Sequence, residues 1–329
     1  MINTLRLDAA IAADVATAAD LLLQGHLVAV PTETVYGLAA DATNPTAVSR
    51  IFVAKGRPAD HPLIVHIEDA SVLSNWAKAI PPAAYTLAEA FWPGPLTLLL
   101  PKADHVSPVV TGGLDSIGLR VPAHPVLLQV LRQQHLAVAA PSANRYKKLS
   151  PTSATQVLHG LDGRIEAVLD GGDCQFGLES TIVSLVSDKI EILRAGPISQ
   201  ADLEAVLGLP VHHPKAHQIK VAGNVKAHYQ PNTPFRCLAY PDLIAEVGHS
   251  SAKIAVLHQQ ALPATLQPFY SKVMPTDPVA YGQALYRELF AADQAGAAQI
   301  LLEMPPQTAE WAAIQERLAR AVHEPVLSA

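Results

Sequence analysis

The stretch PTETVYGLAADATNPTAVSRIFVAKGRPADHPLIVH, residues 31–66, carries more structural information than any other part of this chain. An apolar segment at 27–30 runs into it and predicts a buried strand, and 63–65 predicts another. Between them, Lys55 and Arg57 stand two residues apart, flanked by Gly and Pro. Two permanent cations held between strands suit a clamp for polyphosphate or carboxylate. A solvated Lys-Arg turn is the alternative interpretation.

Length and composition predict a two-domain cytoplasmic protein. The chain has 329 residues, a length at which a protein usually divides into more than one domain. Half of the residues are hydrophobic, enough for buried cores. A net charge of −6 argues against broad, sequence-independent binding of nucleic acid but leaves room for a local basic pocket. Cys174 and Cys237 lie far apart, so we expect a reducing compartment and neither a disulfide scaffold nor a zinc site. We expect no secretory leader and no membrane span.

Strands and helices are expected to alternate from residue 26 to about 197, which predicts an α/β domain with a mixed sheet that ends in a hairpin. The expected strands are 27–30, 63–67, 96–100, 117–121, 136–140, 166–169, 180–186 and 190–193. The expected helices are 46–54, 69–77, 84–91, 124–133, 153–158 and 200–207.

The second half of the chain predicts a linker and a small α/β unit. Residues 210–234 are rich in Pro, His and Lys and lack a strong period, which is typical of a linker. Beyond it, the expected strands are 253–257 and 300–302, and the expected helices are 278–296 and 309–322. Their alternation favours a parallel sheet.

Polar side chains stand at several expected strand ends. Ser142 and Asn144 follow the strand at 136–140, where open α/β sheets place ligands, although an ordinary Asx turn is equally compatible. Arg120 interrupts an apolar strand, where it either faces solvent, the commoner case, or binds the carboxylate of a ligand. The glycine-rich loop 170–181 could form an anion cradle or a plain turn.

Other common sites are excluded. The chain contains no GxGxxG, GxxxxGK[ST], HExxH or GxSxG motif, which argues against a dehydrogenase, a P-loop NTPase, a zincin and an α/β-hydrolase. His212, His213 and His217 have no nearby Cys or carboxylate and are interpreted as linker residues. No metal site is expected.

Seven segments resemble the YrdC-like family of threonylcarbamoyl-AMP synthases, in the long form with a C-terminal accessory domain. They occur in the family's order, and the resemblance spans residues 20–230 and, more weakly, 235–325. The segments are PTETVYGL, KGRP-x3-PLIVHI, FWPGPLTLLL, GLRVPAHP, PSAN, GLESTIV and ILRAGPIS.

The resemblance implies a YrdC-like twisted mixed sheet with helices around a concave basic pocket, and a small Rossmann-like α/β domain. It implies a catalytic domain at 1–209, a linker lid at 210–234 and an accessory domain at 235–329. The implied reaction joins L-threonine, bicarbonate and ATP, the last with Mg²⁺, to L-threonylcarbamoyladenylate and releases pyrophosphate. Partner enzymes would transfer the threonylcarbamoyl group to tRNA beside the anticodon; direct tRNA binding is left open.

The resemblance also assigns roles to residues of this chain. The implied catalytic residues are Lys55, Arg57, Ser142 and Asn144. The implied ATP-binding residues are Lys55, Ala59, Ser116, Ser142, Ser150, Arg194 and, in the lid, Tyr229. The implied threonine-binding residues are Thr32, His66, Arg120, Ala140 and Ser180.

A second reading belongs to another class, a YrdC-like RNA-binding module without synthase activity. A concave basic surface would serve either role. Arg120 as a carboxylate ligand and the linker pair His228-Tyr229 favour the enzyme, because an RNA-binding protein needs neither. The acidic composition favours it as well.

Overall fold

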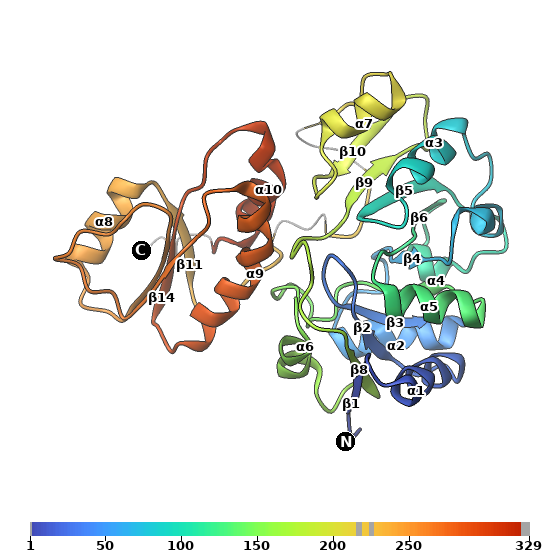
Figure 1. The fold of residues 1–329 in the computed structure, drawn as a ribbon, viewed down its shortest axis with the longest axis horizontal. Coiled ribbons are helices and arrows are strands. Elements are labelled where there is room, and N and C mark those ends of the chain that lie inside the picture. Colours follow the sequence, from blue (N-terminus) through green and yellow to red (C-terminus); the bar gives the residue numbers. More distant parts are fainter. Residues whose placement is uncertain (1, 215–218, 224–226, 324–329) are drawn as a thin grey trace. The chain divides into compact units, whose positions relative to one another are not determined.

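The computed structural model describes residues 2–214, 219–223 and 227–323, which are drawn in Figure 1. The chain forms two compact units. Unit 1 comprises residues 1–146 and 151–224, and unit 2 comprises residues 147–150 and 225–329.

Unit 1 is built on a twisted mixed sheet, to which its described residues contribute ten strands in the order β1-β8-β2-β3-β7-β4-β6-β5-β9-β10. Neighbouring pairs are both parallel, as in β4 with β6, and antiparallel, as in β9 with β10. The mixed sheet and its closing hairpin are therefore confirmed. The strands are β1 (Leu5–Asp8), β2 (Val28–Val30), β3 (Gly37–Asp41), β4 (Ile64–His66), β5 (Leu96–Pro101), β6 (Ser116–Arg120), β7 (Val138–Ala139), β8 (Ala167–Asp170), β9 (Thr181–Ser184) and β10 (Glu191–Arg194).

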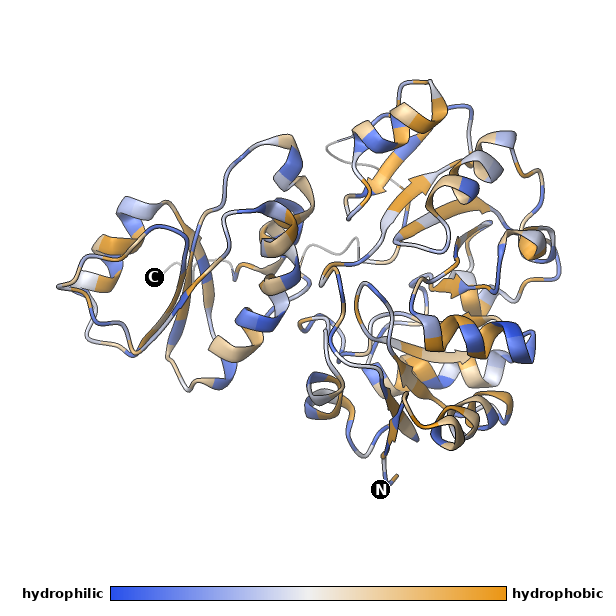
Figure 2. Ribbon diagram, viewed as in Figure 1, coloured by the Kyte–Doolittle hydropathy of each residue, from blue (hydrophilic) through white to orange (hydrophobic). Residues whose placement is uncertain are grey.

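Helices cover both faces of this sheet. Successive strand residues face opposite sides. Accordingly, Val28 and Val30 pack with apolar side chains of α1 and α5, whereas Ala29 packs with those of α2, α3 and α6. Figure 2 shows the strands largely in the hydrophobic colours, as expected for a sheet buried on both sides. The helices of unit 1 are α1 (Ala12–Leu23), α2 (Pro45–Lys55), the 3₁₀ helix η1 (Ala70–Asn75), α3 (Pro82–Phe91), α4 (Pro108–Thr111), α5 (Pro125–Gln134), α6 (Ala154–Leu161) and α7 (Gln200–Leu207).

The informative segment 31–66 folds into a loop, β3, α2, a second loop and β4. Asn44 caps α2, accepting hydrogen bonds from two backbone N–H groups of its first turn. At the other end Gly56 adopts φ 65°, a left-handed conformation that glycine permits, and turns the chain from Lys55 to Arg57. The two cations therefore sit at the end of a capped helix.

Two strands of unit 1 lie outside the sequence prediction. β1 was missed because most of its side chains are exposed, and β3 because Gly-Leu-Ala-Ala has weak strand propensity. β3 forms through its pairing with β2 on one side and β7 on the other. The helix expected at 69–77 is the shorter 3₁₀ helix η1.

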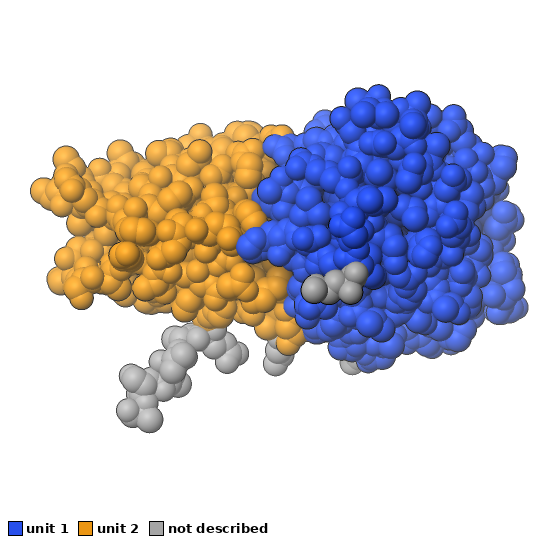
Figure 3. All heavy atoms as spheres, turned by 90° about the horizontal axis from the view of Figure 1, so that it is seen from below, with its two compact units in different colours: residues 1–146, 151–224 blue, residues 147–150, 225–329 orange. Residues whose placement is uncertain are grey.

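Unit 2, coloured separately in Figure 3, contains a smaller parallel sheet. Its described residues give four strands in the order β11-β14-β12-β13, all parallel, which confirms the predicted parallel sheet. The helix expected at 278–296 is α9, with Tyr281, Leu285 and Leu289 among its buried residues. The elements are β11 (Phe235–Leu238), α8 (Tyr240–His249), β12 (Ile254–His258), β13 (Tyr270–Val273), α9 (Pro278–Gln294), β14 (Gln299–Glu303), the 3₁₀ helix η2 (Ala309–Trp311) and α10 (Ala312–Ala321).

The linker proposed at 210–234 is described in part; residues 215–218, including His217, and 224–226 lie outside the described residues. Across the part of the chain that the structure describes, no helix combines the length and apolar character needed to cross a membrane.

Candidate active site

Lys55 contacts two of the other three predicted catalytic residues. Its side chain, at the end of α2, is 2% exposed. The Nζ atom donates hydrogen bonds to the backbone carbonyls of Ser142 and Asn144, each at 2.5 Å. These residues are about ninety positions away in sequence, so the contact depends on the tertiary fold. Burial, followed by the nearby cations Arg57 and Arg145, lowers the pKa of Lys55 well below its ordinary value.

Arg57 lies just beyond the glycine cap and is also buried. Its backbone N–H bonds to the carbonyl of Phe52, and its Nη2 atom donates to the carbonyl of Pro62 at 3.1 Å. The side chain thus crosses its own loop towards β4. The charge of Arg57 contributes to the lowered pKa of Lys55, so the two cations lie close enough to interact.

The segment that carries Ser142 and Asn144 directly follows the C-terminal end of β7, an interior strand of the sheet. Ser142 forms an isolated bridge with Gly37, at the start of β3, and Asn144 is buried. Ala140, a predicted threonine-side residue, donates its backbone N–H to Ile64, at the start of β4, at 3.0 Å. Strand pairing therefore places this segment beside the segment 31–66.

Arg120, at the end of β6, is part of a buried ion pair. Its Nη2 atom lies 2.5 Å from Oε1 of Glu33, and each side chain is 4% exposed. Nε donates to the carbonyl of Gly94 at 3.2 Å. The second carboxylate oxygen of Glu33 accepts the backbone N–H of Ala123 at 3.0 Å. The guanidinium is thus held by two acceptors, one of them itself held by a backbone N–H, and its Nη1 atom donates to no described residue.

His66 pairs with Arg120 in register across β4 and β6. Its imidazole is 3% exposed, and its Nδ1 atom has no hydrogen-bond partner among the described residues. Burial, followed by the charge of Arg120, lowers the pKa of His66 well below its ordinary value. The imidazole is therefore neutral near pH 7 and offers hydrogen-bonding capacity to a ligand.

Thr32 shapes the loop between β2 and β3. Its hydroxyl donates to the carbonyl of Val35 at 2.6 Å and accepts the backbone N–H of Thr34 at 3.1 Å. The Thr32 side chain is 2% exposed. This turn precedes Tyr36 and positions Glu33 for its contact with Arg120.

Ser180 and Arg194 are held together at the closing hairpin. Arg194 donates from Nη2 to Oγ of Ser180 at 3.0 Å and from both Nε and Nη2 to its carbonyl. The hydroxyl of Ser180 also lies 2.7 Å from that of Thr97 on β5. Ser180 is a predicted threonine-binding residue and Arg194 a predicted ATP-binding residue, and in the structure they are hydrogen-bonded to each other.

Two predicted ATP-binding residues stand apart from these contacts. Ala59 is exposed in the loop after Arg57. Ser116 begins β6 and pairs with Pro101, whereas Arg120 ends the same strand. The four residue steps from Ser116 to Arg120 span about 13 Å.

Ser150 and Tyr229 belong to unit 2. There, Tyr229 stacks on Tyr286 with ring centroids 5.6 Å apart, and the Arg317 guanidinium lies 5.5 Å from its centroid. Gln230, the next residue, donates its backbone N–H to Lys147 at 2.9 Å. The linker residue Tyr229 and the short segment 147–150 are thus parts of one unit.

Glu33 is the residue that sequence reasoning missed. It lies within the PTET motif but received no role, because a carboxylate gives no sign in sequence of a partner 87 positions away. The sequence does place the acidic Glu33 next to Thr32 and Arg120 inside an apolar strand, and these two features could have suggested an ion pair. In the described part of the chain, no group of three or more His, Cys, Asp or Glu side chains could hold a metal ion.

Comparisons with known proteins identify the family of the chain. Residues 20–196 match the family profile named for Sua5, YciO and YrdC, described as telomere recombination. Residues 198–322 match the profile of the C-terminal domain of threonylcarbamoyl-AMP synthase.

Named relatives match over almost the whole chain. The threonylcarbamoyl-AMP synthase of Bacillus subtilis is 41% identical over 322 residues, covering 93% of this chain and 92% of the relative. That of Pyrococcus abyssi is 38% identical over 318 residues, covering 92% of each. A crystal structure of P. abyssi Sua5 complexed with L-threonine has a TM-score of 0.87 at 34% identity, covering 97% of this chain and 98% of that one. This chain therefore belongs to the threonylcarbamoyl-AMP synthase family.

Proposed function

We propose that this chain makes L-threonylcarbamoyladenylate from L-threonine, bicarbonate and ATP, with release of pyrophosphate. The observation that supports it most is the contact of Lys55 with the carbonyls of Ser142 and Asn144. That contact joins two segments shared with the family in a chain 41% identical to a named synthase.

The reaction needs anions to be held in line rather than a nucleophilic side chain. The threonine nitrogen attacks the carbon of bicarbonate and water leaves, giving a carbamate. A carbamate oxygen then attacks the α-phosphorus of ATP, the bond from that phosphorus to the bridging oxygen breaks, and pyrophosphate departs. Such a step depends on positioning and charge neutralisation. Buried cations are suited to both tasks.

We assign the phosphate side to Lys55, Arg57, Ser142 and Asn144, with Ala59, Ser116, Ser150, Arg194 and Tyr229 as further ATP contacts. A nearby polyphosphate favours the ammonium form of Lys55 and so opposes the effect of burial on its pKa. Mg²⁺ would arrive on the phosphate oxygens of ATP, since the described residues offer no carboxylate cluster for it.

We assign the threonine side to Thr32, His66, Arg120, Ala140 and Ser180. The open Nη1 atom of Arg120 is suited to the threonine carboxylate, while Glu33 and the Gly94 carbonyl keep the guanidinium oriented. The unpartnered Nδ1 atom of neutral His66 is suited to the amine or hydroxyl of the substrate. Glu33 acts as a positioning residue in this arrangement.

We further propose residues 1–209 as the catalytic domain, 210–234 as a linker lid and 235–329 as an accessory domain. The stack of Tyr229 on Tyr286 supports a role for unit 2 in setting the lid residue. A closed lid would protect the carbamate and the adenylate from water. The product would serve threonylcarbamoyl transfer to tRNA by partner enzymes, which implies action in the cytoplasm.

Replacing Tyr286 by Leu is expected to raise the KM for ATP by about three- to tenfold, because an aromatic pair contributes about 0.5–1.5 kcal/mol. The KM for threonine should stay unchanged. The control is Tyr85→Leu, at a 47% exposed tyrosine of α3. Steady-state kinetics with each substrate varied would separate the two constants, and an equal rise in both would contradict the assigned role of the stack.

The function is tested by incubating the full chain with ATP, bicarbonate and a panel of amino acids, and measuring pyrophosphate. Threonine is expected to give the strong signal, with serine and valine far weaker. Absence of pyrophosphate release with threonine, combined with tight binding of structured RNA, would favour the RNA-binding alternative.

A further inference from the structure

A second pocket of unit 1 lies outside the proposed active site. It has a volume of about 440 Å³, within the range of small-molecule sites, and none of its lining residues is a predicted ATP or threonine contact. It opens where β3 and β4 end. Because β7 runs antiparallel to both, their carboxyl ends share an edge of the sheet, the usual place for ligands in α/β proteins.

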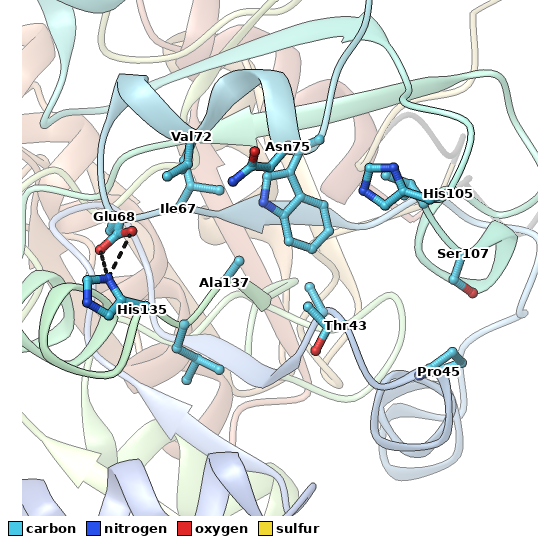
Figure 4. Close-up of a pocket in the computed structure, with 14 residues that line it drawn as sticks. Thr43, Pro45, Ile67, Glu68, Val72, Asn75, His105, Ser107, His135 and Ala137 are labelled. Carbon is cyan, nitrogen blue, oxygen red and sulfur yellow. Dashed lines mark hydrogen bonds and ion pairs between the residues drawn. The ribbon is translucent and has the colours of Figure 1, made fainter.

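The walls of this pocket combine an aromatic ring with one carboxylate. Trp76, after η1, and Glu68, after β4, both line it. Glu68 keeps a side-chain exposure of 16%. Figure 4 shows Glu68 at one end beside His135, and His105 and Ser107 towards the other end. A carboxylate and an aromatic ring lining one pocket are the groups with which proteins recognise organic cations.

The charge of the pocket sets the ligand class. Among its described lining residues there is no Lys or Arg, so a phosphate or carboxylate ligand would meet no permanent positive charge. The proposed ATP site, by contrast, contains Lys55 and Arg57. Lys78 and Asp104, which neighbour the pocket in sequence, form an ion pair with each other at 2.5 Å. Glu68 therefore supplies the charge that a ligand would meet.

The carboxylate of Glu68 has a weak internal partner. Nδ1 of His135 lies 3.2 Å from Oε2 and 3.4 Å from Oε1. The His135 side chain is 83% exposed, and a histidine is a cation only when protonated. An ion pair with so exposed a partner contributes little, so an external cation can displace the imidazole at low cost.

We propose that this pocket binds a small organic cation, an alkylammonium or alkylguanidinium group, with Glu68 as its counter-charge and Trp76 as its aromatic wall. Polar side chains of Thr43, Asn75 and Ser107 also line the pocket. The site is separate from the proposed synthase chemistry, so either can fail without the other.

The test uses the full chain labelled with 5-fluorotryptophan and ¹⁹F NMR, because the chain has three tryptophans. Butylguanidinium is titrated against butylurea, its uncharged isostere, and against butyl phosphate. We expect a saturable shift of the Trp76 resonance with butylguanidinium alone. Trp311, buried in unit 2, serves as the internal reference and should not shift. Equal shifts with butylurea, or none with butylguanidinium, would overturn the proposal.

Variants assign the effect to the two side chains. Glu68→Gln, which preserves shape, is expected to weaken butylguanidinium binding about tenfold, as for loss of a charge-assisted hydrogen bond. Glu310→Gln, at an exposed carboxylate, is the matched control. Unchanged affinity in Glu68→Gln, with its melting temperature unchanged, would contradict the assignment.

The same titration separates two sources of the cation. Acetyl-Ala-Arg-Ala-amide presents the guanidinium as an arginine side chain of a protein partner, whereas butylguanidinium presents it as a free small molecule. Tighter binding of the peptide would identify a partner side chain, and tighter binding of the free cation would identify a metabolite. Failure of both would overturn the proposal.

Discussion

Lys55→Ala and Arg57→Ala are each expected to lower pyrophosphate release from ATP and threonine by about a hundred- to a thousandfold, the usual effect of removing one preorganised charge from an acyl- or phosphoryl-transfer site. Both side chains are buried, and Lys55 holds the carbonyls of Ser142 and Asn144. Its removal therefore takes away a charge and also loosens the segment that carries two other proposed catalytic residues.

Two controls separate these effects. Lys78→Ala removes a 55% exposed lysine and should leave turnover unchanged. Lys55→Met keeps the length and apolar contacts of the stem without the charge, so its activity should be as low as that of Lys55→Ala while its melting temperature stays closer to that of the parent chain. Turnover near the parental rate in either Lys55→Ala or Arg57→Ala would remove the basis of the assigned phosphate site.

Glu33→Gln is expected to lower the free energy of unfolding by about 3 kcal/mol, because it leaves the guanidinium of Arg120 buried without its counter-charge. For a unit of this size, such a loss corresponds to a fall in melting temperature of about 6–12 °C. The KM for threonine should rise more than the KM for ATP, since the freed guanidinium loses its fixed orientation. Thermal melting and steady-state kinetics measure the two effects.

A double-mutant cycle makes this prediction specific to the pair. Arg120→Met removes the charge at the other end, and the double variant Glu33→Gln/Arg120→Met should be less destabilised than the sum of the single variants. Glu89→Gln, at an exposed carboxylate of α3, should change neither stability nor kinetics. Strict additivity in the cycle would show that the two side chains do not depend on each other.

The sequence predicted those parts of the fold that local pattern controls. α2 and β4 follow from the apolar pattern, and the structure adds Asn44 and Gly56 as the caps of α2. β3 could not be predicted, because its Ala-rich residues become a strand only between β2 and β7. Pairings of this kind are set by tertiary context rather than by propensity.

In the candidate site, too, sequence motifs indicate some residues, whereas other contacts depend on the tertiary fold. Motif order nominated Lys55, Ser142 and Asn144, and the structure places them in contact. Glu33 and Arg120 are 87 positions apart in sequence, and no local sequence pattern predicts their pairing. The placement of residues 147–150 with unit 2 is equally invisible in sequence, because it rests on backbone contacts such as that from Gln230 to Lys147.

The central claim is that this chain joins three small molecules into one adenylate, and mass spectrometry with ¹³C-bicarbonate tests it most directly. The full chain, given ATP, threonine and labelled bicarbonate, should form threonylcarbamoyladenylate one mass unit heavier than the unlabelled product, together with pyrophosphate in equal amount. Pyrophosphate without labelled adenylate, or no nucleotide product at all, would contradict the account.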